Sequence, residues 1–209
     1  MNTVPNGLQV DKVHIWRGDR HVLKGISLLA APGELVHVSG PNGTGKTTLL
    51  RVLTGLLIPE QGRVTWCAKD IGRFRSEYLA QLAYLSHEPA LKADLTALEN
   101  LKFAVGLKRR VSADELRECL SRAGVAHCAQ LPARVLSAGQ RRRVAMARVL
   151  AMRAPLWLLD EPFTNLDAQG AKLVLELLLA HVRNAGLAVV VAHQDLQIEW
   201  PLRRLELTA

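Results

Sequence analysis

The sequence is poor in cysteine and lacks a hydrophobic segment of membrane-spanning length. Its three cysteines, Cys67, Cys119 and Cys128, have no CxxC spacing, which argues against a disulfide framework, a zinc site and covalent haem attachment. The longest apolar stretches, such as residues 187–192, are far shorter than the ~20 residues that a bilayer-spanning helix needs. The first residues have no basic segment followed by an apolar one, so we expect no secretory signal and a chain that stays in the cytoplasm.

The rest of the composition is that of an ordinary folded protein. Hydrophobic residues make up 49% and charged residues 22% of the 209 positions, which excludes disordered, collagenous and low-complexity classes. A chain of this length forms one substantial domain, with room for an embedded subdomain. The 27 Lys and Arg residues exceed the 19 Asp and Glu residues, and the resulting net charge of +8 suits nucleic acid, a nucleotide or an anionic membrane surface as partner.

The N-terminal part of the chain predicts a β-hairpin, then a strand, a loop and a helix. Two runs within residues 8–28 alternate apolar and polar side chains around Arg17-Gly18-Asp19-Arg20, which indicates an antiparallel hairpin with one solvated face. Residues 34–39 form a predicted strand, and a glycine-rich loop begins at Gly40. Residues 47–57 have helical periodicity.

The C-terminal part contains continuous apolar runs in place of alternating ones. Residues 156–159 and 187–191 are two such runs, and a helical pattern at 168–184 lies between them. Continuous runs separated by a helix predict parallel strands that are buried on both faces. Together with a strand at 63–67, these patterns predict an α/β fold with a mainly parallel core sheet and an N-terminal antiparallel β subdomain.

Residues 89–154 differ from both flanks in having a helical character. Three hydroxyl residues there are followed three positions later by Glu or Gln, the capping-box pattern that marks the N-terminus of a helix. The pairs are Thr96 and Glu99, Ser112 and Glu115, and Ser137 and Gln140. We therefore expect an inserted helical subdomain at about 89–154 within a single domain spanning 1–209.

The loop after the predicted strand at 34–39 matches the phosphate-loop pattern GxxxxGK(S/T) at every fixed position. The predicted nucleotide-binding residues are Gly40, Pro41, Asn42, Gly43, Thr44, Gly45, Lys46, Thr47 and Thr48. Glycines let the backbone amides point at phosphate oxygens, Lys46 reaches the β and γ phosphates, and the Thr47 hydroxyl can ligate magnesium. The order of strand, loop and helix is the context that such a loop needs.

Two acidic residues, Asp160 and Glu161, follow the buried apolar run at 156–159. Ligands of open α/β sheets bind at the carboxyl ends of the strands, so a carboxylate there, next to the phosphate loop, is placed to ligate magnesium. We predict Asp160 as that ligand. Glu161, one residue further along, is placed to orient the attacking water or accept its proton.

Five segments taken together resemble the ATP-binding cassette (ABC) ATPases. In chain order they are the phosphate loop, Leu136-Ser137-Ala138-Gly139-Gln140, the strand ending at Asp160 and Glu161, Asn165-Leu166-Asp167, and His193. The similarity covers about residues 25–196, and the LSxGQ segment is its specific element because many other phosphate-loop proteins lack it. The resemblance implies a phosphate-loop NTPase fold of ABC type, with ATP and Mg²⁺ as cofactors and ATP hydrolysis as the activity.

The resemblance also implies a homodimer at turnover. Ser137 and Gly139 belong to the signature motif, which contacts the γ-phosphate bound by the opposite subunit, and Asp167 resembles the aspartate that crosses this interface. His193 resembles the histidine that contacts the γ-phosphate. Taken alone, it would be read as an ordinary histidine at the end of a strand, so this role comes from the family resemblance. Glu161, His193 and Lys46 are thus the expected catalytic residues.

Two positions depart from the family pattern. His87 stands where the family usually has Gln, the residue that touches magnesium, and its reach and charge differ from those of Gln. We include His87 in the predicted metal site. Trp16 is the candidate for the aromatic ring that stacks on adenine, but it lies one residue early and leaves Arg17 at the expected place, so Trp16 either stacks on adenine or fills the face of the sheet.

The run Arg141-Arg142-Arg143 invites a nucleic-acid interpretation. On the helix predicted to begin near Ser137, successive side chains point about 100° apart, so the three cannot form one patch. We therefore interpret the run as a solvated helix start that also makes subunit contacts.

Within the family, a short chain with no predicted membrane span resembles a separate ATP-binding subunit. Residues 95–101, 136–145 and 154–164 are similar to the ATP-binding subunits of cytochrome c maturation systems, which are described as haem exporters. That resemblance implies an integral membrane subunit as partner, haem-handling periplasmic proteins as indirect partners, and no nucleic acid. It also implies a peripheral position on the cytoplasmic face of the inner membrane.

Two alternatives remain open at the level of sequence. One is an ATP-binding subunit for another substrate, such as a lipid, a lipoprotein or a metal complex. The other is a soluble cassette ATPase that acts on ribosomes or DNA, which the net charge of +8 suggests. A single phosphate loop, a single signature segment and the lack of a heptad run argue against this second alternative.

Overall fold

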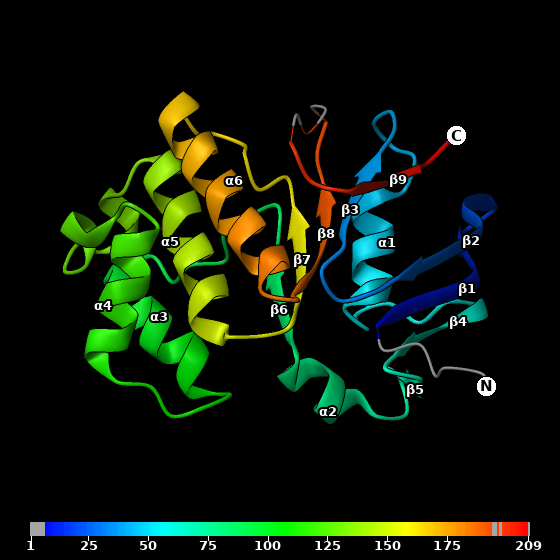
Figure 1. Cartoon of the computed structure of the whole chain (residues 1–209), viewed down its shortest axis with the longest axis horizontal. Coiled ribbons are helices and arrows are strands. Elements are labelled where there is room, and N and C mark those ends of the chain that lie inside the picture. The colour runs from blue at the N-terminus through cyan, green and yellow to red at the C-terminus, as the bar shows by residue number, and fades with distance from the viewer. Residues whose placement is uncertain (1–6, 194–195, 197, 209) are drawn as a thin grey trace.

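The computed structural model describes residues 7–193, 196 and 198–208, so the expectation about a secretory signal at residues 1–6 lies outside it. Two sheets and a group of helices make up the fold (Figure 1). The strands are β1 (Leu8–Arg17), β2 (Arg20–Ala30), β3 (Leu35–Ser39), β4 (Gln61–Trp66), β5 (Lys69–Asp70), β6 (Leu82–Leu85), β7 (Leu156–Asp160), β8 (Leu187–Val191) and β9 (Leu202–Glu206). The helices are α1 (Lys46–Leu53), α2 (Arg75–Ala80), α3 (Ala97–Gly106), α4 (Ala113–Arg122), α5 (Ala138–Met152) and α6 (Ala168–Arg183), with 3-10 turns at Ala126–Cys128 and Ala133–Val135.

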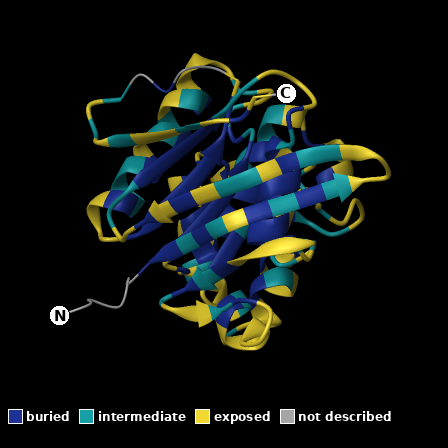
Figure 2. Ribbon diagram, turned by 90° about the vertical axis from the view of Figure 1, so that its right-hand side faces the viewer, coloured by how far each residue is buried: buried dark blue, intermediate teal, exposed yellow. Residues whose placement is uncertain are grey.

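The antiparallel sheet has the strand order β2-β1-β4-β5 and confirms the predicted hairpin. Along β1 the buried side chains are apolar and belong to Leu8, Val10, Val13 and Ile15. Their neighbours are partly or fully exposed, and Figure 2 shows the resulting alternation along the strands that face the viewer. One face of this sheet therefore packs on the core while the other faces water, as the alternating sequence pattern requires.

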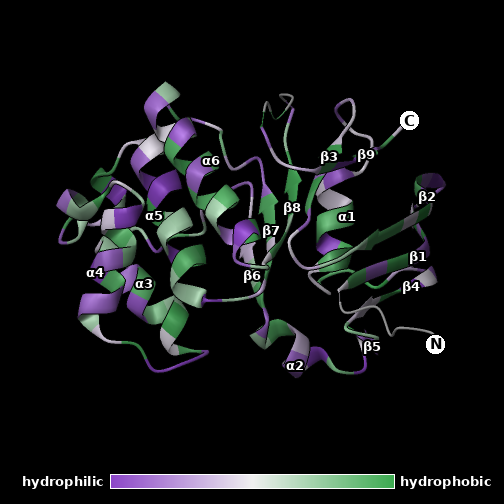
Figure 3. Ribbon diagram, viewed as in Figure 1, coloured by the Kyte–Doolittle hydropathy of each residue, from purple (hydrophilic) through white to green (hydrophobic). Residues whose placement is uncertain are grey.

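The second sheet has the order β6-β7-β8-β3-β9, and all neighbouring strands are parallel. Every residue of β7 and β8 is buried. Along β7, Trp157 and Leu159 belong to the core beside α5 and α6, whereas Leu156 and Leu158 belong to the core beside α1 and the antiparallel sheet. Because both faces are covered, these strands are mainly apolar (Figure 3), with Asp160 at the end of β7 as the charged exception, and the predicted α/β fold with its parallel core sheet is confirmed.

Helices α3, α4 and α5 lie between β6 and β7 in the chain and pack on one another. Thr96 and Ser137 each form the complete capping box that the sequence predicts. At α4 only half of the box forms, because Ser112 accepts a hydrogen bond from the Glu115 amide while the Glu115 carboxylate pairs with Arg109 and Arg153. The predicted reciprocal bond from Glu115 is therefore wrong.

Helix α1 is shorter than its sequence pattern suggests. It ends at Leu53 and not near residue 57, because Gly55 adopts a left-handed φ of 68° and closes the last turn through its amide bond to Val52 O. The sequence also did not lead us to expect α2, β6 or β9. Strands β6 and β9 form the two edges of the parallel sheet, where a four- or five-residue run is too short to give a clear periodic signal.

His181, in the last turn of α6, is a partly buried base that joins this helix to the parallel sheet. Its ring stacks on Trp157 with centroids 3.9 Å apart, and its Nε2–H donates to the Leu187 carbonyl at 3.2 Å. Gly186 makes this approach possible, since a Cβ there would lie 2.2 Å from the ring. Burial lowers the pKa of His181 to about 4, against two backbone hydrogen bonds that raise it.

We predict that His181 makes stability fall in acid. Below the unfolded value of 6.5 only the unfolded chain binds this proton, so stability is lost as pH falls towards the folded pKa of about 4. Urea unfolding at about pH 7 and about pH 4.5 should therefore show His181→Gln losing less stability than the unsubstituted chain, by on the order of 2 kcal/mol. Equal losses in the two proteins would contradict this role.

Candidate functional site

Most of the predicted site residues meet at the carboxyl edge of the parallel sheet. Four loops begin there, after β3, β6, β7 and β8, because parallel strands present their carboxyl ends on the same side (Figure 1). They enclose a pocket of about 440 Å³. Of the residues predicted from the sequence, the pocket is lined by Asn42, Gly43, Gly45, Lys46, Thr47, Thr48, His87, Asp160, Glu161 and His193.

The phosphate loop curls around the ammonium group of Lys46. Its Nζ is buried with the side chain and donates to the carbonyls of Gly40, at 2.7 Å, and Pro41, at 2.9 Å. The Thr44 hydroxyl also donates to the Pro41 carbonyl, at 3.0 Å. Gly40 has a φ of 137°, and a Cβ there would lie 2.3 Å from Leu207 O, so this position requires glycine.

Helix α1 begins at Lys46, directly after the loop, so its free amides and the positive end of its dipole face the pocket. Thr47 and Thr48 lie in its first turn and also line the pocket. The loop and the helix start together form a site for a negatively charged group such as a phosphate.

Asp160, the last residue of β7, provides a buried carboxylate beside Thr47. The residue is 1% exposed, and its Oδ2 has no hydrogen-bond partner among the residues that the structure describes. Burial raises the pKa of this carboxyl, while a hydrogen bond from the Thr47 side chain and the charges of His87 and Arg142 lower it. A carboxylate oxygen that lacks a partner, next to a hydroxyl, suits a hard divalent cation.

Glu161 follows β7 in a left-handed conformation with a φ of 51°, which is uncommon for a residue other than glycine. Its amide donates to Val191 O at 2.9 Å and so ties it to the end of β8. The Oε1 atom of Glu161 lies 3.3 Å from Nε2 of His193, which follows β8. The Glu161 side chain is 13% exposed and that of His193 is 52% exposed, so the carboxylate is held at the pocket wall and the imidazole is more open to solvent.

Arg142 corrects our interpretation of the arginine run as a solvated helix start. It is 2% exposed, and its guanidinium donates to the carbonyls of Ser86, His87, Asp160 and Glu161. Burial lowers the pKa of Arg142 to about 10, so it stays charged at neutral pH. The 100° spacing of a helix explains why one arginine of three points inward. The buried acceptors of such a guanidinium come from distant loops and leave no local sequence signal.

Trp16 does not reach the pocket. It lies on the outer part of β1, where its ring stacks on His21 with centroids 4.0 Å apart and on His14 at 5.6 Å. Arg17 and Arg20 line the pocket from the same hairpin, and Arg20 donates to Gly43 O at 2.8 Å. The stacked rings favour the interpretation in which Trp16 covers the face of the sheet, and stacking of Trp16 on adenine stays a prediction. The pairing of β1 with β2 is irregular next to Trp16, and the following residue, Arg17, lines the pocket.

The signature segment lies outside this pocket in the same chain. Ser137 is exposed and caps α5. Gly139 packs on the backbone of the loop between β7 and α6, since a Cβ there would lie 2.7 Å from Asn165 O. Asp167 caps α6 by accepting a hydrogen bond from the Gly170 amide at 2.8 Å. The starts of α5 and α6 thus stand together at the same end of the molecule as the pocket (Figure 1).

A phosphate loop, two acidic residues at the carboxyl end of β7 and a separate helix-capping serine segment define a cassette of the P-loop NTPase class. Residues 23–164 match the family model described as ABC transporter. The chain belongs to this family, as the sequence predicted, and is an ATP-binding cassette that hydrolyses ATP.

Curated relatives cover nearly the whole chain. It is 46% identical over 194 residues to "Cytochrome c biogenesis ATP-binding export protein CcmA" of Methylococcus capsulatus, which covers 92% of this chain and 93% of that protein. It is 43% identical to the protein of the same name from Nitrosococcus oceani, over 97% of this chain and 92% of that protein. Among solved structures, a dimeric ATP-binding cassette bound to ADP and phosphate is similar, with a TM-score of 0.82, 27% identity and coverage of 90% and 88% of the two chains.

The hairpin arrangement makes a prediction about nucleotide affinity. Arg17→Ala removes a guanidinium from the pocket wall, whereas Trp16→Ala removes a ring that stacks outside it. Titration with a fluorescent ATP analogue should show roughly 3- to 10-fold weaker binding for Arg17→Ala, the size of a lost contact between a cation and a ring or phosphate. Trp16→Ala should bind as the unsubstituted chain does. The opposite ranking would restore Trp16 as the adenine-stacking residue.

Proposed function

We propose that this chain is the ATP-hydrolysing subunit of the ABC complex that matures c-type cytochromes. Relatives at 42–46% identity over most of the chain carry the name of a cytochrome c biogenesis ATP-binding export protein, and this supports the assignment. The single observation that carries the chemistry is that the buried Lys46 ammonium inside a curled loop shares one pocket with the buried carboxyl group of Asp160 and the pocket-wall carboxyl group of Glu161.

ATP binds with its phosphates in the loop. The amides of the first turn of α1 donate to phosphate oxygens, and Lys46 turns from the Gly40 and Pro41 carbonyls towards the β and γ phosphates. Asn42 and Thr44 belong to the loop itself, and Thr48 belongs to the first turn of α1. Arg17 and Arg20 close the pocket from the hairpin side.

The donor set beside the loop fits Mg²⁺. Thr47 and Asp160 would hold the ion through a hydroxyl and a carboxylate oxygen, and His87 stands at the pocket edge close enough to lower the Asp160 pKa. When bound, the ion supplies charge that offsets the phosphate oxygens during transfer. The ion also relieves the cost of burying Asp160.

Glu161 and His193 are adjacent in the pocket and together carry out the hydrolytic step. Glu161 is a base whose carboxylate is held at the pocket wall, so it can orient the water that attacks the γ-phosphate and accept its proton. Nε2 of His193 lies 3.3 Å from that carboxylate. We assign His193 to contact the γ-phosphate. Lys46 stabilises the charge on the transferred group.

The complete site requires two copies of the chain. Ser137 and Gly139 lie outside their own chain's pocket, and Ser137 is exposed at the start of α5, where a helix N-terminus can meet the phosphates held by a second copy. Asp167 lies at the start of α6 beside this segment. One similar cassette is dimeric in both of its solved structures, which supports this arrangement.

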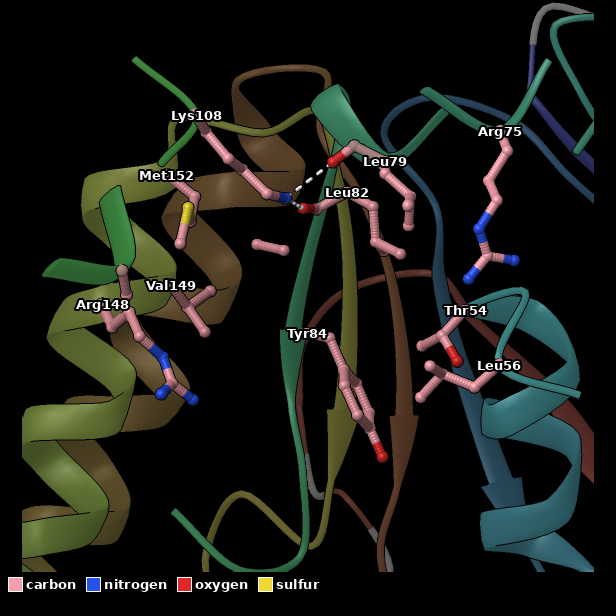
Figure 4. Close-up of a pocket in the computed structure, with 12 residues that line it drawn as sticks. Thr54, Leu56, Arg75, Leu79, Leu82, Tyr84, Lys108, Arg148, Val149 and Met152 are labelled. Carbon is pink, nitrogen blue, oxygen red and sulfur yellow. Dashed lines mark hydrogen bonds between the residues drawn. The ribbon is translucent and has the colours of Figure 1, made fainter. Parts of the chain in front are cut away.

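A groove between the helices and the sheet edge is the surface we assign to the integral membrane subunit. It has a volume of about 310 Å³ and is lined by apolar side chains of α2, β6 and α5, together with Thr54 and Leu56 (Figure 4). Lys108, Arg75 and Arg148 stand around it with their head groups on backbone carbonyls. An amphipathic helix with acidic ends suits such a surface. Helix α1 connects this groove to the phosphate loop.

The chain acts at the cytoplasmic face of the membrane. Among the described residues, no helix combines the length and apolar character that crossing a bilayer requires. The net charge of +8 favours an anionic membrane surface. Periplasmic haem-handling proteins are reached only through the membrane subunit, and nucleic acid is not a partner.

Removal of the catalytic carboxylate should separate ATP binding from turnover. Glu161→Gln keeps the shape and the pocket contacts but removes the base, so turnover should fall roughly 10²- to 10⁴-fold while ATP affinity stays unchanged. Size-exclusion chromatography with ATP should show an accumulated dimer. Hydrolysis at the unsubstituted rate would remove Glu161 from this role.

The cellular assignment is tested by complementation. In a bacterium whose own cytochrome c maturation ATPase has been deleted, this chain should restore covalently bound haem on c-type cytochromes, measured on haem-stained gels. Leu56→Glu places a charge at a groove residue that is 64% exposed, so it should abolish this restoration and leave the chain's ATPase rate intact. Leu29→Glu, at a residue 51% exposed on β2, is the control and should restore normally. No haem attachment with the unsubstituted chain, at normal expression, would contradict the assignment.

A further inference from the structure

The side chain of Arg142 is placed where two strands and a helix meet. It belongs to α5, five residues after the capping serine Ser137. Among the described residues it is the one buried arginine, with 2% of its surface exposed. Nη1 donates to Ser86 O at 2.7 Å and to His87 O at 3.0 Å. Nη2 donates to the carbonyls of Asp160 and Glu161. One guanidinium therefore contacts the loops that follow β6 and β7.

These four carbonyls lie just beyond the last paired residues of β6 and β7. The parallel ladder between β6 and β7 ends with the pair Leu85 and Leu159. Beyond that pair the two chains separate into the loops that carry His87 and Glu161. The planar fork of a guanidinium can bond to two acceptors on each side, so Arg142 continues the connection between the strands past their last paired residues.

Glu161 has particular need of such support. A left-handed φ of 51° in a residue other than glycine persists only where the surroundings enforce it. Its amide donates to Val191 O at 2.9 Å, and its carbonyl accepts hydrogen bonds from the Arg142 guanidinium and, at 3.2 Å, from the Thr164 amide. With both peptide groups fixed, the carboxylate is directed towards His193. Release of one of these peptides would let the residue relax to an ordinary conformation and turn its side chain away.

We propose that Arg142 is a positioning residue for hydrolysis, which holds the Glu161 backbone in its left-handed conformation and joins it to the signature helix α5. The proposal rests on the proposed role of Glu161. Because the same helix begins at Ser137, a shift of α5 is transmitted by one rigid side chain to the loops that carry His87 and Glu161. Arg142 makes this connection through main-chain carbonyls, so the connection does not depend on whether position 87 carries His or the Gln that is usual in the family.

The test compares turnover with nucleotide affinity in the full-length chain. Arg142→Met keeps an unbranched apolar stem and removes the guanidinium donors, so the maximal ATPase rate should fall roughly 10- to 100-fold, the size typical of a misplaced catalytic group. Affinity for a fluorescent ATP analogue should change less than about 3-fold, because the phosphate loop is not contacted. Arg142→Lys, which restores the charge and some of the donors, should recover part of the rate.

Arg109→Met is the matched control. Arg109 also donates several hydrogen bonds to backbone carbonyls, including that of Ala151 at the other end of α5, but it lies outside the nucleotide pocket. Its replacement should lower Tm and leave the ATPase rate of the folded protein unchanged. If Arg109→Met and Arg142→Met lose activity in proportion to their loss of Tm, Arg142 has only a structural role and the proposal is overturned.

A double variant separates this proposal from the role of Glu161 itself. In single-turnover measurements, Arg142→Met combined with Glu161→Gln should be no slower than Glu161→Gln alone, since both changes disable the same base. Additive losses would overturn the proposal. If Glu161→Gln is inactive and Arg142→Met is fully active, the positioning role fails while the base assignment stands. If Glu161→Gln is fully active, the base assignment itself fails.

Discussion

The parallel register of β3, β6, β7 and β8 is the constraint on which the site depends. Since the four strands run the same way, the phosphate loop, His87, the Asp160 and Glu161 pair, and His193 emerge at one edge although they span more than 150 positions of the chain. The register pairs Asp160 with Val191, so Glu161 and His193 stand within reach of one another. Strands buried on both faces hold this register, because a slip would move Trp157 and Leu159 into the wrong core.

Buried polar groups at this edge exchange stability for function. Asp160 is almost completely buried with a raised pKa, and Glu161 keeps a left-handed backbone. Neither arrangement favours the folded state by itself. Arg142 offsets part of this cost, because its positive charge faces both carboxyl groups and its donors satisfy four carbonyls. The edge is thus held ready for a ligand that brings the missing positive charge and phosphate oxygens.

Much of the fold and site could be predicted because their signals are local. Glycines with positive φ mark the phosphate loop, capping boxes mark α3 and α5, and unbroken apolar runs mark β7 and β8. The misses depend on contacts between distant segments. Arg142 is buried by loops 18 to 56 positions away, and the direction of Trp16 is decided by irregular pairing of β1 with β2 next to it. The short edge strands β6 and β9 take their form from neighbours that periodicity does not show.

The division of each site between two copies of the chain is tested most directly by mixing two inactive variants. Lys46→Ala empties the phosphate loop of its ammonium, and Ser137→Arg places a bulky charge at an exposed position that only a second copy would meet. A mixed dimer then contains one site with both changes and one site with neither. Equal amounts should recover roughly a quarter of the unsubstituted ATPase rate, since half of the dimers are mixed and each has one intact site. A mixture as inactive as its components, with mixed dimers present, would contradict a shared site.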